Sequence, residues 1–454
     1  MRSCLAHLTG AALAALLLVP AIGPAQAAPS AAGLRSTQRW PRPPFVSSRN
    51  RRLFIASGQT YTINDVGAPN PSRYPPYNPE YGPEGPQGFN NTGQMFGASY
   101  EKIKGYGGTN SPKTDCLLYD NGAFLDPSAS TSIYSCDWYS MNDANTNGVF
   151  EAVGNITNNY NPDATAFVAT GSIKSSSLPV TQFEAMNPSA ALQSVNANGT
   201  GFGYTYDTFV PGSIASAVYS PTTKKFTALQ PVCVAPGASQ NGCLQYLDGL
   251  GPRYLCSFGG CSINATYLLG GTTNSSNFEL YSLSGAPPVF IPSGFTDGNG
   301  NGNSLNAPLE LTNYGLVAAD FATLSGPNSG PYVAVFPAGG SAWQVLPSLS
   351  DGCPSHFLVS SNNSGEVLGF DSCSSSGPNT YWTWDPTNGI QAVNIPANSY
   401  SAVQLLGVND NGQLLATLVT TSGSYHWGTF NPVGGSSSTR RLHAIKRGAI
   451  RIRH

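Results

Sequence analysis

The chain has 454 residues, among them 51 Gly and 36 Pro, and only 10% of its residues are charged. This mixture excludes long surface helices, which need strong helix formers such as Glu and Lys. It also excludes an intrinsically disordered chain, because 40% of the residues are hydrophobic and the net charge is only -2. We therefore predict a large all-β protein.

The first 27 residues have the layout of a secretory signal peptide. Arg2 precedes the apolar run 11–19, and the small-residue triplet 25–27 follows it. We expect cleavage after Ala27, which places the mature protein outside the cytoplasm, as a secreted extracellular or periplasmic protein. A permanent membrane anchor is the alternative, but the run is shorter than the ~20 apolar residues that span a bilayer.

Basic residues concentrate in two arms at the ends of the mature chain. The stretch 53–436 has eight Lys and Arg residues against 23 Asp and Glu, a net charge of -15. The arms 28–52 and 437–454 carry twelve basic residues and no acidic ones, and we predict that they are disordered. They fold back onto the acidic body, bind an external anionic surface of the cell envelope, or remain solvated and do neither. No nucleic acid is expected as a partner, because the acidic body would repel phosphate.

A short turn containing Asn and Gly, followed by two or three apolar residues, recurs along the acidic body. Its copies begin at Asn91, Asn147, Asn198, Asn313, Asn363 and Asn411, and a degenerate copy occupies 263–270. An aromatic strand follows each turn, and a short strand ending in Leu-Pro or Ile-Pro often comes next. Asn and Gly tolerate the positive φ angles that tight hairpin turns require. Three or four short strands per unit is the content of one propeller blade.

Seven such units predict a seven-bladed β-propeller over 53–436. The approximate units are 54–129, 130–179, 180–232, 233–293, 294–350, 351–398 and 399–435. An open β-solenoid is one alternative, but its rungs are usually shorter. Two successive β-sandwiches are another, but they would not produce one continuous period. Closure of the ring requires a strand at 59–63 to pair in the last blade, beside Thr429 and Phe430.

The repeated unit resembles a known family. Its Asn-Asn-x-Gly-Gln turn at 90–94, the apolar strand with Gly after it, and the later aromatic strand resemble the HAF-type extracellular repeat of exported bacterial proteins. The resemblance covers nearly all of 54–435, although only Ala166-Phe167 keeps the central Ala-Phe pair and Trp427 follows His426. It implies a secreted, propeller-like repeat protein, and it carries no catalytic residues.

Eight cysteines remain after removal of the signal peptide, and an even number in an exported chain predicts four disulfides. The same spacing of 20 residues separates Cys116 from Cys136 and Cys353 from Cys373, so we expect these two pairs. The other four are expected to pair among themselves: Cys233, Cys243, Cys256 and Cys261. A zinc site is the alternative, but the sequence has neither C-x-x-C nor H-E-x-x-H.

Catalytic motifs are scarce in the predicted propeller. There is no Gly-x-Ser-x-Gly elbow, and both histidines of the body, His356 and His426, are expected to lie in or beside strands. The turns are similar to the Asp-box of sialidases, yet the body has only Arg73 and Arg253 to bind an anionic sugar. Other glycosidases and lyases use paired carboxylates, and the sequence does not single out one pair among 23 acids.

Calcium is the one cofactor that the sequence suggests. Asp143, Asn145 and Asn147, with Glu151 after them, resemble the opening of a calcium-binding loop with oxygen ligands. The segment 297–302 repeats the pattern, but neither copy has Glu at the twelfth position. We favour the alternative, a polar hairpin turn.

The loop 72–86 suggests a ligand site. Tyr74, Tyr77 and Tyr81, next to Arg73, lie on a Pro-rich chain that is stiff and extended. Such rings either stack on a glycan or peptide or simply cover the propeller face. The leading hypothesis is therefore a secreted, non-enzymatic propeller that acts as a binding or cell-surface interaction module. The alternative is a carbohydrate-active enzyme, a glycoside hydrolase or lyase, that uses carboxylates on one face.

A second aromatic pair, Trp382 and Trp384, is expected to belong to the core. Two residues apart on a strand, both side chains point to the same face. Packing between neighbouring blades is the role that we predict for them.

Overall fold

Every element that the computed structural model describes is a β-strand, which confirms the all-β prediction. No helix occurs in the described part of the chain, and so none there could cross a membrane. The described residues are 46–47, 58–69, 85–100, 114–126, 133–144, 147–158, 165–172, 180–188, 191–206, 214–228, 262–263, 267–271, 277–282, 289–292, 294–296, 302–311, 316–323, 331–337, 340–349, 355–372, 380–396 and 400–433.

Two large sheets hold most of the strands. The first has the order β1-β28-β29-β30-β2-β27-β26-β25-β24. Its strands are β1 (Val46–Ser47), β2 (Gly58–Gly67), β24 (Ser355–Ser361), β25 (Val367–Ser372), β26 (Thr380–Asp385), β27 (Gly389–Asn394), β28 (Tyr400–Val408), β29 (Leu414–Thr420) and β30 (Tyr425–Pro432). The second has the order β10-β9-β8-β7-β5-β4-β3, with β6 paired to β5. Its strands are β3 (Gly85–Phe89), β4 (Met95–Tyr100), β5 (Thr114–Asp120), β6 (Ala123–Leu125), β7 (Ile133–Met141), β8 (Val149–Asn158), β9 (Thr165–Ser172) and β10 (Val180–Pro188).

Three smaller sheets follow one another along the chain, each with its strands in sequence order. The first contains β11 (Ala191–Val195), β12 (Gly201–Tyr206), β13 (Ile214–Ser220) and β14 (Lys225–Ala228). The second contains β15 (Ser262–Ile263), β16 (Tyr267–Gly271), β17 (Asn277–Ser282) and β18 (Val289–Pro292). The third contains β19 (Gly294–Thr296), β20 (Gly302–Leu311), β21 (Val317–Thr323), β22 (Tyr332–Phe336) and β23 (Gln344–Val345).

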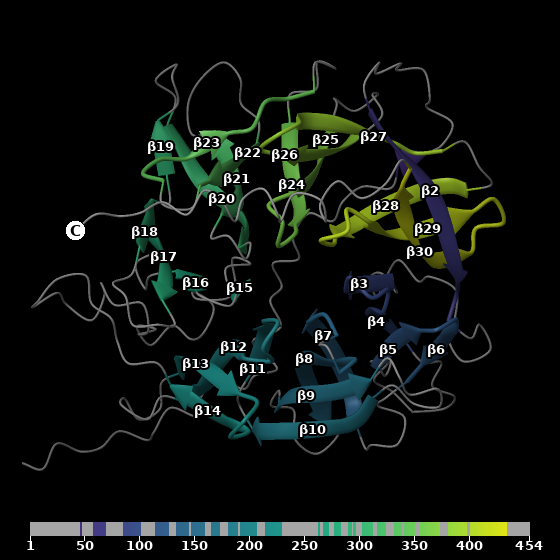
Figure 1. Ribbon diagram of the computed structural model, residues 1–454, viewed down its shortest axis with the longest axis vertical. Coiled ribbons are helices and arrows are strands. Elements are labelled where there is room, and N and C mark those ends of the chain that lie inside the picture. The colour runs from purple at the N-terminus through teal and green to yellow at the C-terminus, as the bar shows by residue number, and fades with distance from the viewer. Residues whose placement is uncertain are drawn as a thin grey trace, which may run out of the picture.

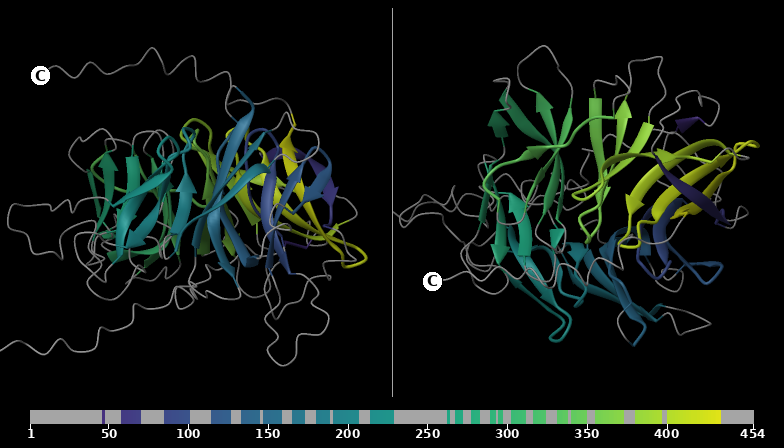
Figure 2. Two further views of the ribbon diagram at one scale, coloured as in Figure 1. Left: turned by 90° about the horizontal axis from the view of Figure 1, so that it is seen from below. Right: turned by 45° about the horizontal axis from the view of Figure 1, so that its top comes forward.

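The sheets are arranged in a ring, so the fold is propeller-like (Figure 1). We call a run of paired strands that follow one another in the chain a strand group, and a large sheet holds more than one such group. The strand groups follow one another round the ring in chain order, and β3, β7, β15, β24 and β28 lie toward its middle. Seen from the side, the strands run through the thickness of the ring (Figure 2). Each group therefore presents one set of strand ends to each face of the ring.

The predicted boundary at residue 179 separates two strands that belong together. β10 begins at Val180 and pairs antiparallel with β9, with Phe183 opposite Ala169. The next sheet starts at Ala191 with β11. Each unit is recognised in the sequence by its turn, and in this unit the turn comes after β11. The residues before the turn carry no repeated signal, so the repeat does not show where the unit begins.

A strand from the beginning of the chain completes the last group of strands. β2 pairs antiparallel with β30, with Ile63 opposite Phe430 and Asn64 opposite Thr429. The predicted pairing of 59–63 beside Thr429 and Phe430 is therefore confirmed. The first residues of β2 also pair in parallel with β27. One strand thus joins two neighbouring groups.

β1 corrects one part of the sequence prediction. It pairs antiparallel with β28, with Val46 opposite Val403 and Ser47 opposite Ala402. Both residues of β1 fall in the arm 28–52, and for them the prediction of disorder is wrong. The edge of β28 offers backbone hydrogen-bonding groups that an extended chain can pair with. The arm 437–454 lies outside the described residues.

Apolar side chains are buried on both faces of the strand groups. Leu414 of β29 packs in one cluster with Leu368 and Phe430, whereas its neighbour Leu415 packs in another with Met95. Successive strand residues point to opposite faces, so one strand contributes to the core on each side. The core is therefore continuous between neighbouring groups.

The tryptophan pair of β26 lies in the core, as predicted. Trp382 is 1% exposed and Trp384 is 6% exposed, and both belong to one apolar cluster with Val335 of β22. β22 and β26 belong to neighbouring groups. The pair therefore packs the two groups together and is unavailable to a ligand.

One of the predicted disulfides is present among the described residues. Cys116 of β5 and Cys136 of β7 are bonded, with their Cα atoms 5.3 Å apart, and both are fully buried. This confirms the pairing expected from their spacing. The bond joins β3–β6 to β7–β10, two successive strand groups within the second large sheet. The other six cysteines lie outside the described residues: Cys233, Cys243, Cys256, Cys261, Cys353 and Cys373.

Candidate functional site

Five turns, which we call the inner turns, connect the first two strands of their groups. They begin at Asn90, Asn142, Asn196, Asn362 and Asn409. In all but the second, Oδ1 of the first Asn accepts hydrogen bonds from the backbone N–H groups two and four residues later. The fourth position of those turns is a Gly with positive φ, between 70° and 92°. The Asn side chain and the Gly backbone together fix the turn locally.

In four of the five inner turns, the first Asn donates a hydrogen bond to a neighbouring inner turn. Nδ2 of Asn90 donates to the backbone carbonyl of Asn142 at 3.2 Å, and Nδ2 of Asn142 donates to that of Asn196 at 3.0 Å. Asn362 donates in the same way to Asn409 at 2.8 Å, and Asn409 donates to Asn90 at 3.2 Å. The last bond joins the final turn to the first. The series of side-chain bonds therefore continues across the closure of the ring.

Carboxylates occupy the second position of two inner turns. Asp410 accepts hydrogen bonds from the backbone N–H of Asn363 at 2.6 Å and from Nδ2 of Asn91 at 3.0 Å. Asp143 accepts one from the backbone N–H of Asn91 at 2.6 Å. Burial raises the pKa of Asp143, the hydrogen bonds from Asn91 oppose this, and the nearby Asp410 adds to it. These carboxylates hold neighbouring turns together.

In three inner turns the fifth position carries an amide or a carboxyl: Gln94, Glu366 and Gln413. Gln413 accepts a hydrogen bond from Nδ2 of Asn409 at 2.8 Å, and Glu366 accepts one from Nδ2 of Asn362 at 3.1 Å. Burial, with further contributions from Asp385 and Asp410, raises the pKa of Glu366 to about 7, although the bond from Asn362 opposes the shift. A neutral side chain therefore suits this position.

The exposed atoms of the inner turns are mostly amides and hydroxyls. Thr92, Asn198, Asn363 and Ser364 are exposed. Amides and hydroxyls both donate and accept hydrogen bonds, as the hydroxyl groups of a sugar do. The carboxylates between the turns disfavour an anionic ligand. The inner turns can therefore bind a neutral polar ligand.

A different arrangement lies at the other end of β24. His356 is at the start of this strand, whereas Asn362 follows its end. Nδ1 of His356 lies 2.6 Å from Oδ1 of Asp371, and Nε1 of Trp382 donates to the same oxygen at 2.6 Å. The Asp371 side chain is fully buried and that of His356 is 12% exposed. A carboxylate on Nδ1 leaves Nε2 of the imidazole to accept a proton.

Both predicted histidine positions are confirmed, since His356 lies in β24 and His426 lies in β30. Sequence reasoning did not identify Asp371 as the partner of His356. The two residues are on adjacent antiparallel strands and face each other in the register. No local motif signals this pair, because it depends on the pairing of β24 with β25.

The predicted calcium ligands are described in part. Asp143 is bonded to Asn91, as above, and the backbone N–H of Glu151 donates to Oδ1 of Asn142 at 2.7 Å. Asn147 is exposed and Asn145 lies outside the described residues. Within the part of the chain that is described, no group of three or more His, Cys, Asp and Glu side chains is placed to hold a metal ion. Calcium binding at this turn, which the sequence favours less than a polar hairpin turn, stays an untested prediction.

Residues 72–84 of the aromatic loop predicted to bind a ligand lie outside the described residues, and with them Arg73, Tyr74, Tyr77 and Tyr81, whereas its last two residues begin β3.

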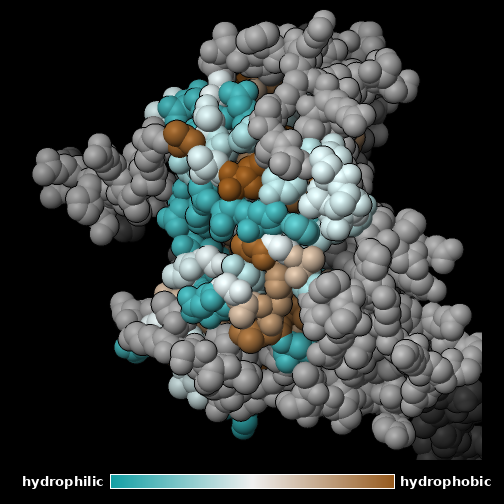
Figure 3. All heavy atoms as spheres, turned by 90° about the vertical axis from the view of Figure 1, so that its right-hand side faces the viewer, coloured by the Kyte–Doolittle hydropathy of each residue, from teal (hydrophilic) through white to brown (hydrophobic). Residues whose placement is uncertain are grey.

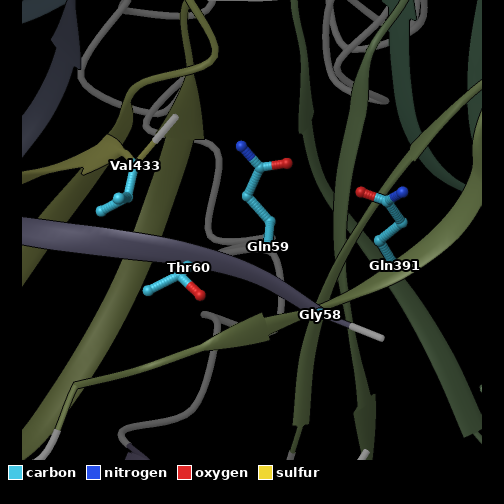
Figure 4. Close-up of a pocket in the computed structure, with 5 residues that line it drawn as sticks. All are labelled: Gly58, Gln59, Thr60, Gln391 and Val433. Atoms are coloured by element: carbon cyan, nitrogen blue, oxygen red, sulfur yellow. The ribbon is translucent and has the colours of Figure 1, made fainter. Parts of the chain in front are cut away.

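A shallow pocket of about 420 Å³ lies where β2 meets β27 (Figure 4). Gln59 and Gln391 point into it, and Gly58, Thr60 and Val433 complete its lining. None of these five residues is an acid or a base. The pocket can donate and accept hydrogen bonds, but its lining supplies no group for proton transfer.

No family model and no curated protein matches the chain. Solved structures that it resembles include an oligogalacturonate lyase in complex with manganese, with a TM-score of 0.44, 9% identity, and coverage of 87% of this chain and 97% of the lyase. The polysaccharide lyase Uly1 matches with a TM-score of 0.37 and 8% identity over 86% and 98% of the two chains. The β-propeller domain of the Trilobed protease from Pyrococcus furiosus matches with a TM-score of 0.38 and 10% identity over 65% and 82%. Likeness at this level leaves the function to be argued from the residues of this chain.

Proposed function

We propose that the protein is a secreted, seven-bladed β-propeller of the HAF type that binds an extracellular glycan or peptide without transforming it. The spacing of the inner turns supports seven blades. Asn90, Asn142 and Asn196 follow one another at intervals of 52 and 54 residues, and Asn362 precedes Asn409 by 47. The interval of 166 residues from Asn196 to Asn362 equals about three of these and includes the sheets β15–β18 and β19–β23.

The bonding of the carboxylates in the inner turns is the observation that carries the binding role. Asp143 and Asp410 accept hydrogen bonds from amide groups of a neighbouring turn. A glycosidase would instead hold two carboxyl groups facing a substrate, one of them free to donate a proton. The inner turns form a rigid frame, and their exposed amides and hydroxyls remain to contact a ligand.

The charge distribution favours a neutral or cationic ligand, and it favours attachment of the protein to an anionic surface. The body carries a net charge of -15, so an acidic glycan would be repelled. The two basic arms suit attachment to an anionic envelope surface. Binding of the ligand and attachment to the cell would then use different parts of the chain.

A carbohydrate-active enzyme is the second candidate, and His356 is the observation that favours it. Its Nδ1 faces the buried carboxylate of Asp371 at 2.6 Å, an arrangement that orients an imidazole as a general base. It lies on β24, one of the strands toward the middle of the ring (Figure 1).

A glycan array on the mature protein, followed by product analysis of each sugar that binds, tests both candidates. For the binding module we expect retention of neutral glycans and no cleavage. Asn198→Ala combined with Ser364→Ala should then weaken binding by roughly tenfold, the equivalent of about 1.4 kcal/mol, while His356→Gln leaves it unchanged. Cleavage of a bound glycan that His356→Gln abolishes would overturn the binding module in favour of the enzyme.

A further inference from the structure

The side chains of Asp65, Tyr400 and His426 come from three strands and meet in an arrangement that we call the Asp65 clasp. Tyr400 donates its hydroxyl hydrogen bond to Oδ2 of Asp65 at 2.6 Å. Nδ1 of His426 lies 2.9 Å from the same oxygen. The backbone N–H of Gly67 donates to Oδ1 at 2.8 Å. The clasp connects β2 with β28 and β30, although β2 touches only β30 and β27 in the sheet.

Besides its backbone pairing, β2 is held by Tyr61 in the core and by Ile63 and Val66, which pack against the core and are only partly buried. Of its ten residues only Tyr61 is buried, and Thr60, Thr62, Asn64 and Asp65 are exposed. Figure 3 views the side of the ring on which β2 and β30 lie, and hydrophilic side chains cover much of its described surface. Elements with little buried apolar surface open at a lower free energy than the rest of a protein. At the end of β2 the clasp adds side-chain hydrogen bonds to the partly buried packing of Val66.

Ionised Asp65 is the acceptor on which the clasp depends. Partial burial alone would raise its pKa, but the hydrogen bonds from Tyr400, His426 and Gly67, with the charge of His426, together lower it. Burial and the contact with Asp65 raise the pKa of Tyr400 to about 12, so its hydroxyl remains a donor. The strands β27 and β29 bring no ionisable side chain to the clasp.

The sign of the pH effect follows from the lowered pKa of Asp65. A carboxyl group with a lower pKa in the folded protein stabilises the fold above its unfolded value of about 4, and this contribution is lost as the pH falls through the folded value. A protonated carboxyl also carries no charge to attract His426. Acid therefore weakens the clasp.

We propose that β2 is an acid-released strap, in which protonation of Asp65 opens the clasp and lets β2 detach from β30 and β27 while the other strand groups stay folded. The ring would then open at its closure, where the beginning of the chain meets its end. The free edge of β30 would become available for pairing.

Hydrogen exchange measured by mass spectrometry on the mature protein between pH 3 and pH 7, corrected for the intrinsic exchange rate, tests the strap. From pH 5 to pH 3 we expect the protection of a peptide covering 58–67 to fall, because protonation of Asp65 removes the charge on which the clasp depends. A peptide covering β8 should keep its protection. Asp65→Asn should remove the pH step, whereas the control Glu151→Gln on β8 should retain it.

Tyr400→Phe provides a second measurement, because it keeps the carboxyl and removes one donor. The strap predicts that the acid step of the 58–67 peptide then moves to higher pH. Equal loss of protection in all peptides would overturn the proposal, and so would a wild-type acid step in Asp65→Asn.

Discussion

Two buried polar side chains accept hydrogen bonds from backbone N–H groups at strand edges inside the ring. Oδ1 of Asp320, on β21, accepts a hydrogen bond from the backbone N–H of Leu358 at 2.6 Å. The hydroxyl oxygen of Tyr381, on β26, accepts one from the N–H of Leu405 at 3.1 Å. Both leucines lie on first strands of their groups, β24 and β28, whose edge N–H groups have no neighbouring strand in the sheet at these positions. An unpaired buried N–H is costly, so each side chain replaces a missing strand.

We expect Asp320→Ala to lower the free energy of unfolding by about 1 to 3 kcal/mol, because it leaves the N–H of Leu358 without its acceptor. Asp320→Asn keeps an acceptor oxygen and removes the buried ionisable group, whose pKa burial raises well above its usual range. Its loss should therefore be smaller. Urea denaturation at pH 7 measures both variants, and equal losses would contradict this role as acceptor.

At the scale of the strand and turn, the sequence located most turns but not the residue that organises them. Asn-Gly pairs and their relatives marked the turns correctly, because positive φ at Gly is a local requirement. The role of the first Asn of these turns was not predicted, since its Nδ2 bond goes to a turn about 50 residues away. The pair of Asp371 with His356 escaped for the same reason, as strand register creates it.

Glu366→Gln should stabilise the protein, and increasingly so as the pH rises. Burial raises the pKa of Glu366 to about 7, so ionisation costs the folded state stability between about pH 4.5 and pH 7. The inner turns that begin at Asn90 and Asn409 carry Gln at this position. We expect a gain of roughly 1 to 3 kcal/mol at pH 8, and little gain at pH 4. Thermal melts across this range measure it, and a gain that does not depend on pH would contradict the explanation.

At the scale of the whole molecule, the period of the sequence predicted a ring and the pairing of β2 with β30. It could not predict β1, because a two-residue strand has no periodic signal. It also assigned β10 to a separate unit from β9, since turn signals mark the middle of each unit better than its borders. Disulfide spacing was informative for Cys116 and Cys136 because successive strand groups bring them together.

Loss of the Cys116–Cys136 disulfide should destabilise the junction between the first two described strand groups. Replacing both cysteines by Ser removes a cross-link between residues 20 apart and adds two buried hydroxyls. We expect a loss of roughly 2 to 4 kcal/mol, seen as a lower melting temperature of the mature protein. Cys116→Ala with Cys136→Ala separates the two effects, since it adds no polar group. An unchanged melting temperature in the Ala variant would show that packing alone holds this junction.

Asn90, Asn142 and Asn362 each donate a hydrogen bond to the turn after their own. Asn409 donates the same kind of bond to Asn90, across the closure of the ring. In this respect no unit is first and none is last. A circularly permuted chain, with its old ends linked and new ends opened in a long loop, would give every described turn the same neighbours. The order in which translation delivers the units is thus separable from the order in which they support one another.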